Sequence, residues 1–336
     1  MKALLSESPG GPEMLVIREI ADPIAGSNDV VVRVAMCGVN FPDALLIRDL
    51  YQIRPPRPFS PGAEISGTVE SIGVRVTRFK VGDRVIGRCG WGGMAEKILL
   101  SEDRCIAIPD SMPFDQAAAF IFTYGTAHYA LCDRAHLRAG ETVLVLGASG
   151  GVGLAAIQMA SAMGATVVAA ASSQEKLAIA VRQGAERGIV YPKGSLDAEV
   201  SKALAGDLKK VCGSDGVNVV FDPVGGPYVE PALRTIALDG RYLVVGFTAG
   251  IPRIPLNLVL LKSCQIVGVD WGAFVRRSVA EADANAQAVL ALYAAGKLAP
   301  FITARFSLAD APAALTLLEQ RKASGKIIVE VGGSLV

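Results

Sequence analysis

The residues with the clearest chemical meaning form a glycine-rich turn between a short apolar run and an alanine-rich run. The segment reads Thr142-Val-Leu-Val-Leu-Gly-Ala-Ser-Gly-Gly-Val-Gly153. Its first half is typical of a buried strand, and the residues after Gly153 are typical of a helix. Such a junction presents backbone N–H groups and the positive end of a helix dipole to a phosphate, and a Cβ there would block a diphosphate. We therefore predict a dinucleotide site at Ser149, Gly150, Gly151, Val152 and Gly153.

The spacing of these glycines departs from the common dinucleotide pattern at one position. Read against G-x-G-x-x-G, the turn has Ala148, Gly150 and Gly153, so an alanine replaces the first glycine. Glycine-rich turns also occur in proteins without a ligand at that place, and the spacing alone does not separate the two cases. The location of the turn between a strand and a helix is what favours dinucleotide binding.

The residues after the second expected strand indicate which dinucleotide is bound. An acidic residue binds the ribose 2′-hydroxyl in NAD-dependent proteins, but here the strand 166–171 ends in Ser172-Ser173. A 2′-phosphate needs hydrogen-bond donors and a cation, which Ser172, Ser173 and Lys176 supply, and Tyr191 is expected beside the adenosine. The alternative is that one serine only caps the following helix and Lys176 is solvated. Because capping and phosphate binding are compatible, we predict NADP(H).

The rhythm of strands and helices from residue 140 predicts a doubly wound α/β domain. The expected strands are apolar throughout, so both faces of the sheet should be covered by helices. Alternation of the two element types implies a parallel sheet with right-handed crossovers, and six strands fit a dinucleotide domain. The strands are expected at 142–146, 166–171, 188–191, 217–221, 241–246 and 265–270, and the helices at 152–163, 174–183, 196–211 and 227–238.

The rest of the chain predicts a second, β-rich domain. Residues 1–122 contain short β-type runs whose glycines suggest the bent strands of a barrel, and the four prolines of 53–62 exclude a helix there. After residue 270 the pattern predicts helices at 279–295 and 310–323 and strands at 301–308 and 326–331. We expect these elements to return to the first domain. The predicted domains are 1–122 with 271–336, and 123–270 for the dinucleotide.

The composition excludes several classes of protein. The chain of 336 residues is 51% hydrophobic and 19% charged with a net charge of +1, which is typical of a globular protein and offers no basic field for nucleic acid. Residues 142–174 carry no charge, but their five glycines argue against a membrane helix. Six scattered cysteines and the lack of a signal-peptide pattern predict a cytoplasmic protein without a disulfide framework.

Several motifs together resemble the zinc-independent quinone oxidoreductases of the medium-chain dehydrogenase/reductase superfamily, a group that includes zeta-crystallin. The resemblance covers essentially the whole chain. It implies a GroES-like β-barrel domain joined to a Rossmann domain, and a homodimer. The motifs are Gly38-Val-Asn40-Phe-Pro-Asp43, Pro61-Gly-Ala-Glu-Ile-Ser-Gly67, Val81-Gly-Asp-Arg-Val85, Ala148-Ser-Gly-Gly-Val-Gly153, Ala169-Ala-Ala-Ser-Ser-x-x-Lys176, Asp222-Pro-Val-Gly-Gly226 and Gly325-Lys326.

The resemblance also implies further site residues. Asn40 matches an asparagine near the nicotinamide ribose, and Tyr51 matches a tyrosine that faces the substrate, so both are expected at the reaction centre. A tyrosine that only packs the loop is the alternative for Tyr51. Leu45 stands where some members have a tyrosine, so this pocket should be more apolar. Further cofactor contacts are expected from Thr126, Tyr129, Gly246, Phe247 and Lys326, the last with a solvated lysine as the alternative.

The residue types argue against both zinc sites of the related alcohol dehydrogenases. Asn40 stands where zinc-dependent relatives have a cysteine, and Ala63 stands where they have a histidine. Alanine has no lone pair and an amide is a poor zinc ligand. Only Cys89 and Cys105 lie in the region of the structural zinc lobe, and His128 and His136 do not rebuild a site. We therefore expect no metal.

Loss of the metal predicts a different reaction. An alcohol dehydrogenase needs a Lewis acid to stabilise the alkoxide, whereas a quinone or α,β-unsaturated carbonyl delocalises the charge that a hydride brings. We predict NADPH-dependent reduction of such a small molecule. An enoyl-thioester reductase stays open as an alternative, since Arg54 and Arg57 could contact a CoA arm. A zinc alcohol dehydrogenase and a non-enzymatic, crystallin-like NADPH-binding protein are the others.

Overall fold

The computed structural model describes residues 1–332 and contains two compact units. One unit runs from Met1 to Phe122 and resumes at Pro300, and the other comprises Thr123–Ala299. The expected dinucleotide domain ends at residue 270, whereas residues 271–299 pack with the second unit. The functional division of the chain stays a prediction, and residues 333–336 of its C-terminal range lie outside the described residues.

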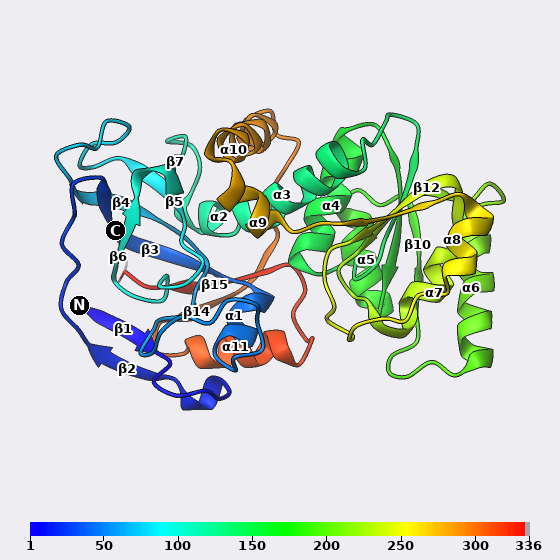
Figure 1. The fold of residues 1–336 in the computed structure, drawn as a ribbon, viewed down its shortest axis with the longest axis horizontal. Coiled ribbons are helices and arrows are strands. Elements are labelled where there is room, and N and C mark those ends of the chain that lie inside the picture. Colours follow the sequence, from blue (N-terminus) through cyan, green and yellow to red (C-terminus); the bar gives the residue numbers. More distant parts are fainter. Residues whose placement is uncertain (333–336) are drawn as a thin grey trace. The chain divides into compact units, whose positions relative to one another are not determined.

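The second unit is built on a six-stranded sheet in which every pairing is parallel (Figure 1). The strand order is β10-β9-β8-β11-β12-β13. Counted along the chain this is 3-2-1-4-5-6, the order of doubly wound dinucleotide domains, so the predicted Rossmann sheet is confirmed. The strands are β8 (Thr142–Val145), β9 (Thr166–Ala171), β10 (Arg187–Val190), β11 (Val217–Asp222), β12 (Ile236–Val244) and β13 (Gln265–Gly268).

Helices cover this sheet and explain why its central strands are apolar along their whole length. In β8 and β9 every residue after the first threonine is buried, because helices pack on the sheet. The helices of the unit are α4 (Gly151–Ala162), α5 (Gln174–Arg182), α6 (Ala198–Cys212), α7 (Val229–Leu233), α8 (Leu256–Lys262), α9 (Trp271–Arg277) and α10 (Val279–Ala294), preceded by α3 (Ile121–His128). Within residues 1–332 none of the helices has both the length and the apolar character that a membrane crossing requires.

One predicted helix is wrong in its second half. The sequence pattern predicts a helix over 227–238, but α7 ends at Leu233 and strand β12 begins at Ile236. Ile236 pairs with Val217 of β11, and the register then shifts before Arg241 pairs with Val219. Pairing with a strand from elsewhere in the chain overrides the local helical preference here.

The first unit contains a bent, mostly antiparallel sheet of seven strands. Its path is β14-β15-β3-β4-β5-β7, with β6 paired to β3. Register shifts interrupt the β3–β4 ladder, which bends the sheet. This is the expected GroES-like arrangement, but the described strands form an open path and not a closed barrel. The strands are β3 (Asp29–Val39), β4 (Glu64–Ile72), β5 (Arg84–Arg88), β6 (Lys97–Ser101), β7 (Cys105–Ala107), β14 (Ile302–Ser307) and β15 (Lys326–Glu330).

Smaller elements complete the first unit. The hairpin of β1 (Lys2–Leu5) and β2 (Val16–Glu19) forms a sheet of its own. Three short helices are α1 (Phe41–Leu46), α2 (Phe114–Ala118) and α11 (Ala311–Glu319). A single residue, Asn40, separates the end of β3 at Val39 from the start of α1 at Phe41, so Asn40 occupies the junction between a central strand and a helix.

Candidate functional site

The glycine turn of the second unit has the backbone that a phosphate site requires. Gly147 has a φ of +56°, a conformation that favours glycine. A Cβ on Gly153 would collide with the carbonyl oxygen of Gly147, so this glycine is needed to seat α4 against the turn. At Gly150 a Cβ would lie 3.4 Å from the Gly147 oxygen, and no other described atom beyond its chain neighbours lies within 4 Å. The turn is therefore tight on its inner side and open outside Gly150.

The open side of the turn carries the donors for an anion. Gly150 is the N-cap of α4 and supplies no side-chain cap. The first N–H groups of a helix have no carbonyl of a preceding turn to bond, so those of Gly151, Val152 and Gly153 are suited to phosphate oxygens. Ser149 lies in the same turn and is buried. The predicted residues therefore fit the diphosphate of a dinucleotide.

The predicted 2′-phosphate residues lie directly after β9. Ser173 is the N-cap of α5, and its Oγ accepts a hydrogen bond of 3.3 Å from the Lys176 N–H. The capping role that the sequence left open is thus real, and it places Ser173 and Lys176 in the same helical turn. Burial, and then the nearby Lys193, lowers the pKa of the half-buried Lys176 ammonium. An anion beside Lys176 would relieve this repulsion between cations.

Aromatic residues fix the segment that follows β10. The Tyr191 N–H donates to the Ala171 carbonyl at 2.9 Å, which ties the end of β10 to the end of β9. The Tyr191 ring lies 4.7 Å from that of Tyr228, and the Tyr228 hydroxyl donates to the Pro192 carbonyl at 2.9 Å. The expected adenosine contact, Tyr191, is therefore held next to the Ser172–Lys176 segment.

Asp222 at the end of β11 organises the neighbouring turn, and we did not predict this role from the sequence. Its Oδ1 accepts hydrogen bonds from the N–H groups of Val224 (2.7 Å) and Gly225 (2.9 Å), and its Oδ2 accepts one from the Tyr242 hydroxyl (2.8 Å). Burial raises the pKa of the Asp222 carboxyl. The signal in the sequence is a carboxylate at the end of an apolar strand, which needs internal partners when buried.

The remaining predicted residues of this unit lie at two places. Gly246 and Phe247 follow β12, where the Gly246 N–H donates to the Asp222 carbonyl at 3.2 Å, and Phe247 is about half exposed. Thr126 and Tyr129 are buried near the end of α3, where the Tyr129 ring stacks on Phe274 of α9 at 4.3 Å. Strands β8, β9, β11 and β12 thus bring the turn residues to one edge of the sheet, the edge where open α/β sheets bind ligands.

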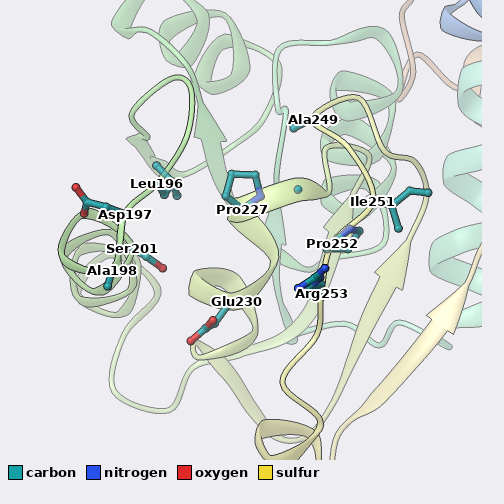
Figure 2. Close-up of a pocket in the computed structure, with 11 residues that line it drawn as sticks. Leu196, Asp197, Ala198, Ser201, Pro227, Glu230, Ala249, Ile251, Pro252 and Arg253 are labelled. Atoms are coloured by element: carbon teal, nitrogen blue, oxygen red, sulfur yellow. The ribbon is translucent and has the colours of Figure 1, made fainter.

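An open pocket of about 530 Å³ lies beyond this edge (Figure 2). It is lined by residues from the start of α6, from the segment that leads into α7, and from the loop after β12. Asp197 and Glu230 line it together with Arg253 (Figure 2). Two carboxylates would repel a phosphate, so this pocket does not fit the diphosphate of a dinucleotide.

Three of the predicted residues belong to the first unit, and two of them meet in a buried polar cluster. The Lys326 Nζ donates to Glu64 Oε1 (2.6 Å) and Asn40 Oδ1 (2.7 Å), and Asn40 Nδ2 donates to Glu64 Oε1 (3.0 Å). Lys326 is 4% exposed and Glu64 is fully buried. The alternative that Lys326 is a solvated surface lysine is therefore wrong, while its predicted cofactor contact stays a prediction.

Strand register explains how this cluster forms. Ile327 pairs with Val39, so Lys326 lies opposite Asn40, and Glu64 pairs with Gly38 across the β3–β4 ladder. The starts of β15 and β4 thus flank the end of β3. A Cβ on Gly38 would collide with the Ala118 carbonyl oxygen and lie 2.7 Å from Glu64 Oε1, so glycine there makes room for the Glu64 carboxylate.

Asp43 lies beside this cluster and is fully buried. Its Oδ2 accepts a 2.8 Å hydrogen bond from the Asn40 N–H, and its Oδ1 accepts one of 3.2 Å from the Gly62 N–H. Burial raises the pKa of the Asp43 carboxyl from 3.8 to about 7, against the effect of these donors. The folded chain therefore binds a proton that the unfolded chain has lost between about pH 4 and pH 7.

Protonation of the Asp43 carboxyl in the folded chain predicts a pH-dependent contribution to stability. We expect the free energy of unfolding of the wild type, minus that of Asp43→Asn, to fall by at least about 1 kcal/mol as the pH rises from about 4 to about 7, and to stay level above that. Urea unfolding of both proteins across this range measures the difference. A difference that is independent of pH would contradict the assignment.

Tyr51 and the proline-rich loop complete the first unit's predicted residues. Tyr51 is half-buried and packs against the hydrophobic core of this unit. Arg57 donates to Asp49 Oδ1 (2.8 Å) and to the Ile47 carbonyl (2.9 Å), so its guanidinium holds the loop in place. Arg54 is exposed. Of the two arginines considered for a CoA arm, one is thus committed to internal contacts.

The donor atoms near Asn40 suit a hydrogen-bonded cluster better than a metal. The Asn40 amide and the Glu64 carboxylate are both bonded to the Lys326 ammonium. Burial raises the pKa of the neighbouring Cys37 and Cys89 thiols, which disfavours the thiolate form that zinc binds. In residues 1–332 no group of three or more His, Cys, Asp or Glu side chains is arranged to hold a metal ion.

Comparison with known proteins shows two domain families and full-length relatives. Residues 26–110 match the alcohol dehydrogenase GroES-like domain, and residues 151–288 match the zinc-binding dehydrogenase domain. The chain is 39% identical to "Quinone oxidoreductase-like protein 2" of Bos taurus over 94% of this chain and 89% of that protein. It is 32% identical to "Quinone oxidoreductase" of Homo sapiens over 98% and 97% of the two chains.

A solved structure shares the fold over the whole chain. The quinone oxidoreductase of Escherichia coli, crystallised with NADPH, superposes with a TM-score of 0.88 at 26% identity and covers 98% of this chain and 100% of that chain. Both units of the present chain therefore have counterparts in a protein that was solved with this dinucleotide.

Proposed function

The chain belongs to the quinone oxidoreductases of the medium-chain dehydrogenase/reductase superfamily, and we propose that it reduces a quinone or an α,β-unsaturated carbonyl with NADPH. The proposed reaction is a hydride transfer without a metal. The observation that carries the proposal is the open glycine turn at the N-terminus of α4, with Ser173 and Lys176 at the start of α5, directly after the next strand. When bound, the reduced nicotinamide supplies the hydride.

In the proposed site, different residues bind the different parts of the dinucleotide. The N–H groups of residues 151–153 hold the diphosphate, which needs no side chain because the helix start supplies the donors. Ser172, Ser173 and Lys176 hold the 2′-phosphate, and no carboxylate at the end of β9 competes for it. Tyr191 packs beside the adenosine, and Gly246 lets the backbone after β12 approach the nicotinamide. Thr126, Tyr129, Asn40 and Tyr51 complete the proposed site.

A metal-free reaction is supported by the chemistry of the donor set. The GroES-like and zinc-binding dehydrogenase domain families imply zinc in some members, but here Asn40 and Ala63 occupy two ligand positions, and Glu64 is paired with Lys326. These residues do not fit a tetrahedral zinc site. Hydrogen bonds to the carbonyl oxygen of a conjugated acceptor, whose charge is delocalised, take the place of a Lewis acid.

An acceptor screen tests the proposed function. We expect NADPH oxidation with quinones or simple enones to exceed that with crotonyl-CoA and acryloyl-CoA in kcat/KM. A tenfold or greater preference for the thioesters would replace the proposal with an enoyl-thioester reductase. Binding of NADPH without turnover of any acceptor would indicate a non-enzymatic, crystallin-like protein. Stoichiometric zinc in the purified protein would indicate an alcohol dehydrogenase.

The preference for NADPH predicts the effect of a single lysine. We expect Lys176→Ala to weaken NADPH binding by about 1–3 kcal/mol, the scale of a charge-assisted hydrogen bond, and to leave NADH binding nearly unchanged. Titration of both dinucleotides by fluorescence measures the two constants. Lys202→Ala, at an exposed lysine of α6, is the matched control. Equal losses for NADPH and NADH would mean that Lys176 supports the fold.

The outer edge of the parallel sheet is proposed to join two chains as a homodimer. Strand β13 is an edge strand, and α8, just before it, exposes Leu256, Leu260 and Leu261 at 71%, 79% and 71%. Apolar side chains clustered next to an unpaired edge are typical of an interface. We expect the double variant Leu260→Glu/Leu261→Glu to have half the wild-type mass by light scattering, and Val74→Glu, at an exposed loop residue, to keep it. A monomeric wild type would end this proposal.

A further inference from the structure

The buried cluster at the end of β3 fixes the Asn40 amide in one orientation. Its Oδ1 faces the Lys326 ammonium at 2.7 Å, and its Nδ2 faces Glu64 Oε1 at 3.0 Å and the Gly38 carbonyl at 3.3 Å. A flipped amide would place its NH₂ group against an ammonium and its oxygen against a carboxylate. Both contacts would be repulsive, so the charges of Lys326 and Glu64 determine which way Asn40 presents its two polar atoms.

All the hydrogen-bonding capacity of Lys326 is directed into the first unit. An ammonium has three donors, and those of Lys326 reach Glu64 Oε1, Asn40 Oδ1 and, at 3.3 Å, the Val39 carbonyl. With 4% of its surface exposed, Lys326 has no further N–H group to offer a cofactor. Its contacts therefore suit a role that is exerted through Asn40.

The same cluster holds both segments where the chain leaves the first unit. Glu64 Oε2 accepts a 2.9 Å hydrogen bond from the Phe122 N–H, and Phe122 is the last residue before the second unit begins. The Lys326 N–H donates to the Phe301 carbonyl at 2.8 Å, one residue after the chain returns at Pro300. Glu64 through its side chain, and Lys326 through its side chain and its backbone N–H, thus contact Asn40 and the two ends of the connecting segments.

We propose that Lys326 and Glu64 are positioning residues that set the orientation of the Asn40 amide for the reaction, and that Lys326 acts through Asn40 and not by contact with the cofactor. The inference rests on the proposed function, because it assigns Asn40 a place beside the reacting groups. It replaces the cofactor contact that the sequence predicted for Lys326.

A double-mutant cycle tests the proposal, because a residue that acts through Asn40 loses its effect when Asn40 is absent. The four proteins are the wild type, Lys326→Met, Asn40→Ala and the double variant. We expect Lys326→Met to lower kcat/KM for the acceptor at least tenfold in the wild-type background and less than twofold in the Asn40→Ala background. Lys322→Met, at an exposed lysine of the same segment, should leave kcat/KM unchanged.

Two further measurements keep the result decisive. If Lys326→Met does not fold, Lys326→Met/Glu64→Gln removes both charges and takes its place in the cycle, again with and without Asn40→Ala. Lys326→Arg, which keeps a cation beside Asn40, should retain more activity than Lys326→Met. Equal fold-losses in both backgrounds, or a rise in the Kd of NADPH that is the same with and without Asn40, would overturn the proposal. An inactive wild type would instead count against the proposed function.

Discussion

Gly150→Val is expected to raise the Kd for NADPH at least about a hundredfold while the protein stays folded. The new side chain would point away from the turn, into the space outside Gly150 where the diphosphate is proposed to lie. It would displace the phosphate from the first N–H groups of α4. Loss of two charge-assisted hydrogen bonds, at about 1.5–3 kcal/mol each, accounts for this factor.

The fold should tolerate this substitution. The backbone at Gly150 is extended, with a φ of −73° and a ψ of 164°, a conformation open to any residue. We expect the free energy of unfolding to fall by only about 1 kcal/mol, the cost of a poorer N-cap. Gly206→Val is the matched control, because a Cβ at Gly206 of α6 also meets open space. Unchanged NADPH binding in Gly150→Val would contradict the phosphate site.

Lys326→Met is expected to have the largest effect on stability. It removes the cation from Glu64, which is fully buried, and breaking a buried ion pair by removal of one partner costs about 3–5 kcal/mol. Urea unfolding followed by tryptophan fluorescence and circular dichroism measures the loss. Because the chain has two compact units, the two signals are analysed separately and not as one transition.

A second substitution separates the buried charge from lost packing. Addition of Glu64→Gln to Lys326→Met should recover part of the stability, because the remaining group is then neutral. Lys322→Met, at an exposed lysine, should change the free energy of unfolding by less than about 0.5 kcal/mol. If Lys326→Met also changed the free energy of unfolding by less than about 0.5 kcal/mol, the ion pair would contribute nothing to the stability of the fold.

The parallel sheet was predictable because its signals are local. Apolar runs such as 142–146 and 166–171 each end before a glycine or a serine, and each lies in a repeating alternation of strand and helix. The start of β12 carries no such signal. Ile236 belongs to a strand because Val217 lies beside it, and that neighbour is set by the tertiary fold.

The dinucleotide turn was likewise predictable, since residues 147–153 and 172–176 are short continuous segments. The cluster around Asn40 was not. Glu64 and Lys326 are 262 positions apart, and only the neighbouring register of β4, β3 and β15 brings them together. A sequence can signal that a carboxylate within an apolar strand needs a partner, but it does not say which cation supplies the charge.

The carbon atom that receives the hydride distinguishes a metal-free conjugate reduction from the reduction of a carbonyl group. NADPH carrying deuterium at the transferred position of the nicotinamide is incubated with the protein and an enone, and the product is examined by NMR. We expect a saturated ketone with deuterium on the carbon β to the carbonyl. Deuterium on the hydroxyl-bearing carbon of an allylic alcohol would contradict this expectation, because that product requires the polarised carbonyl of an alcohol dehydrogenase.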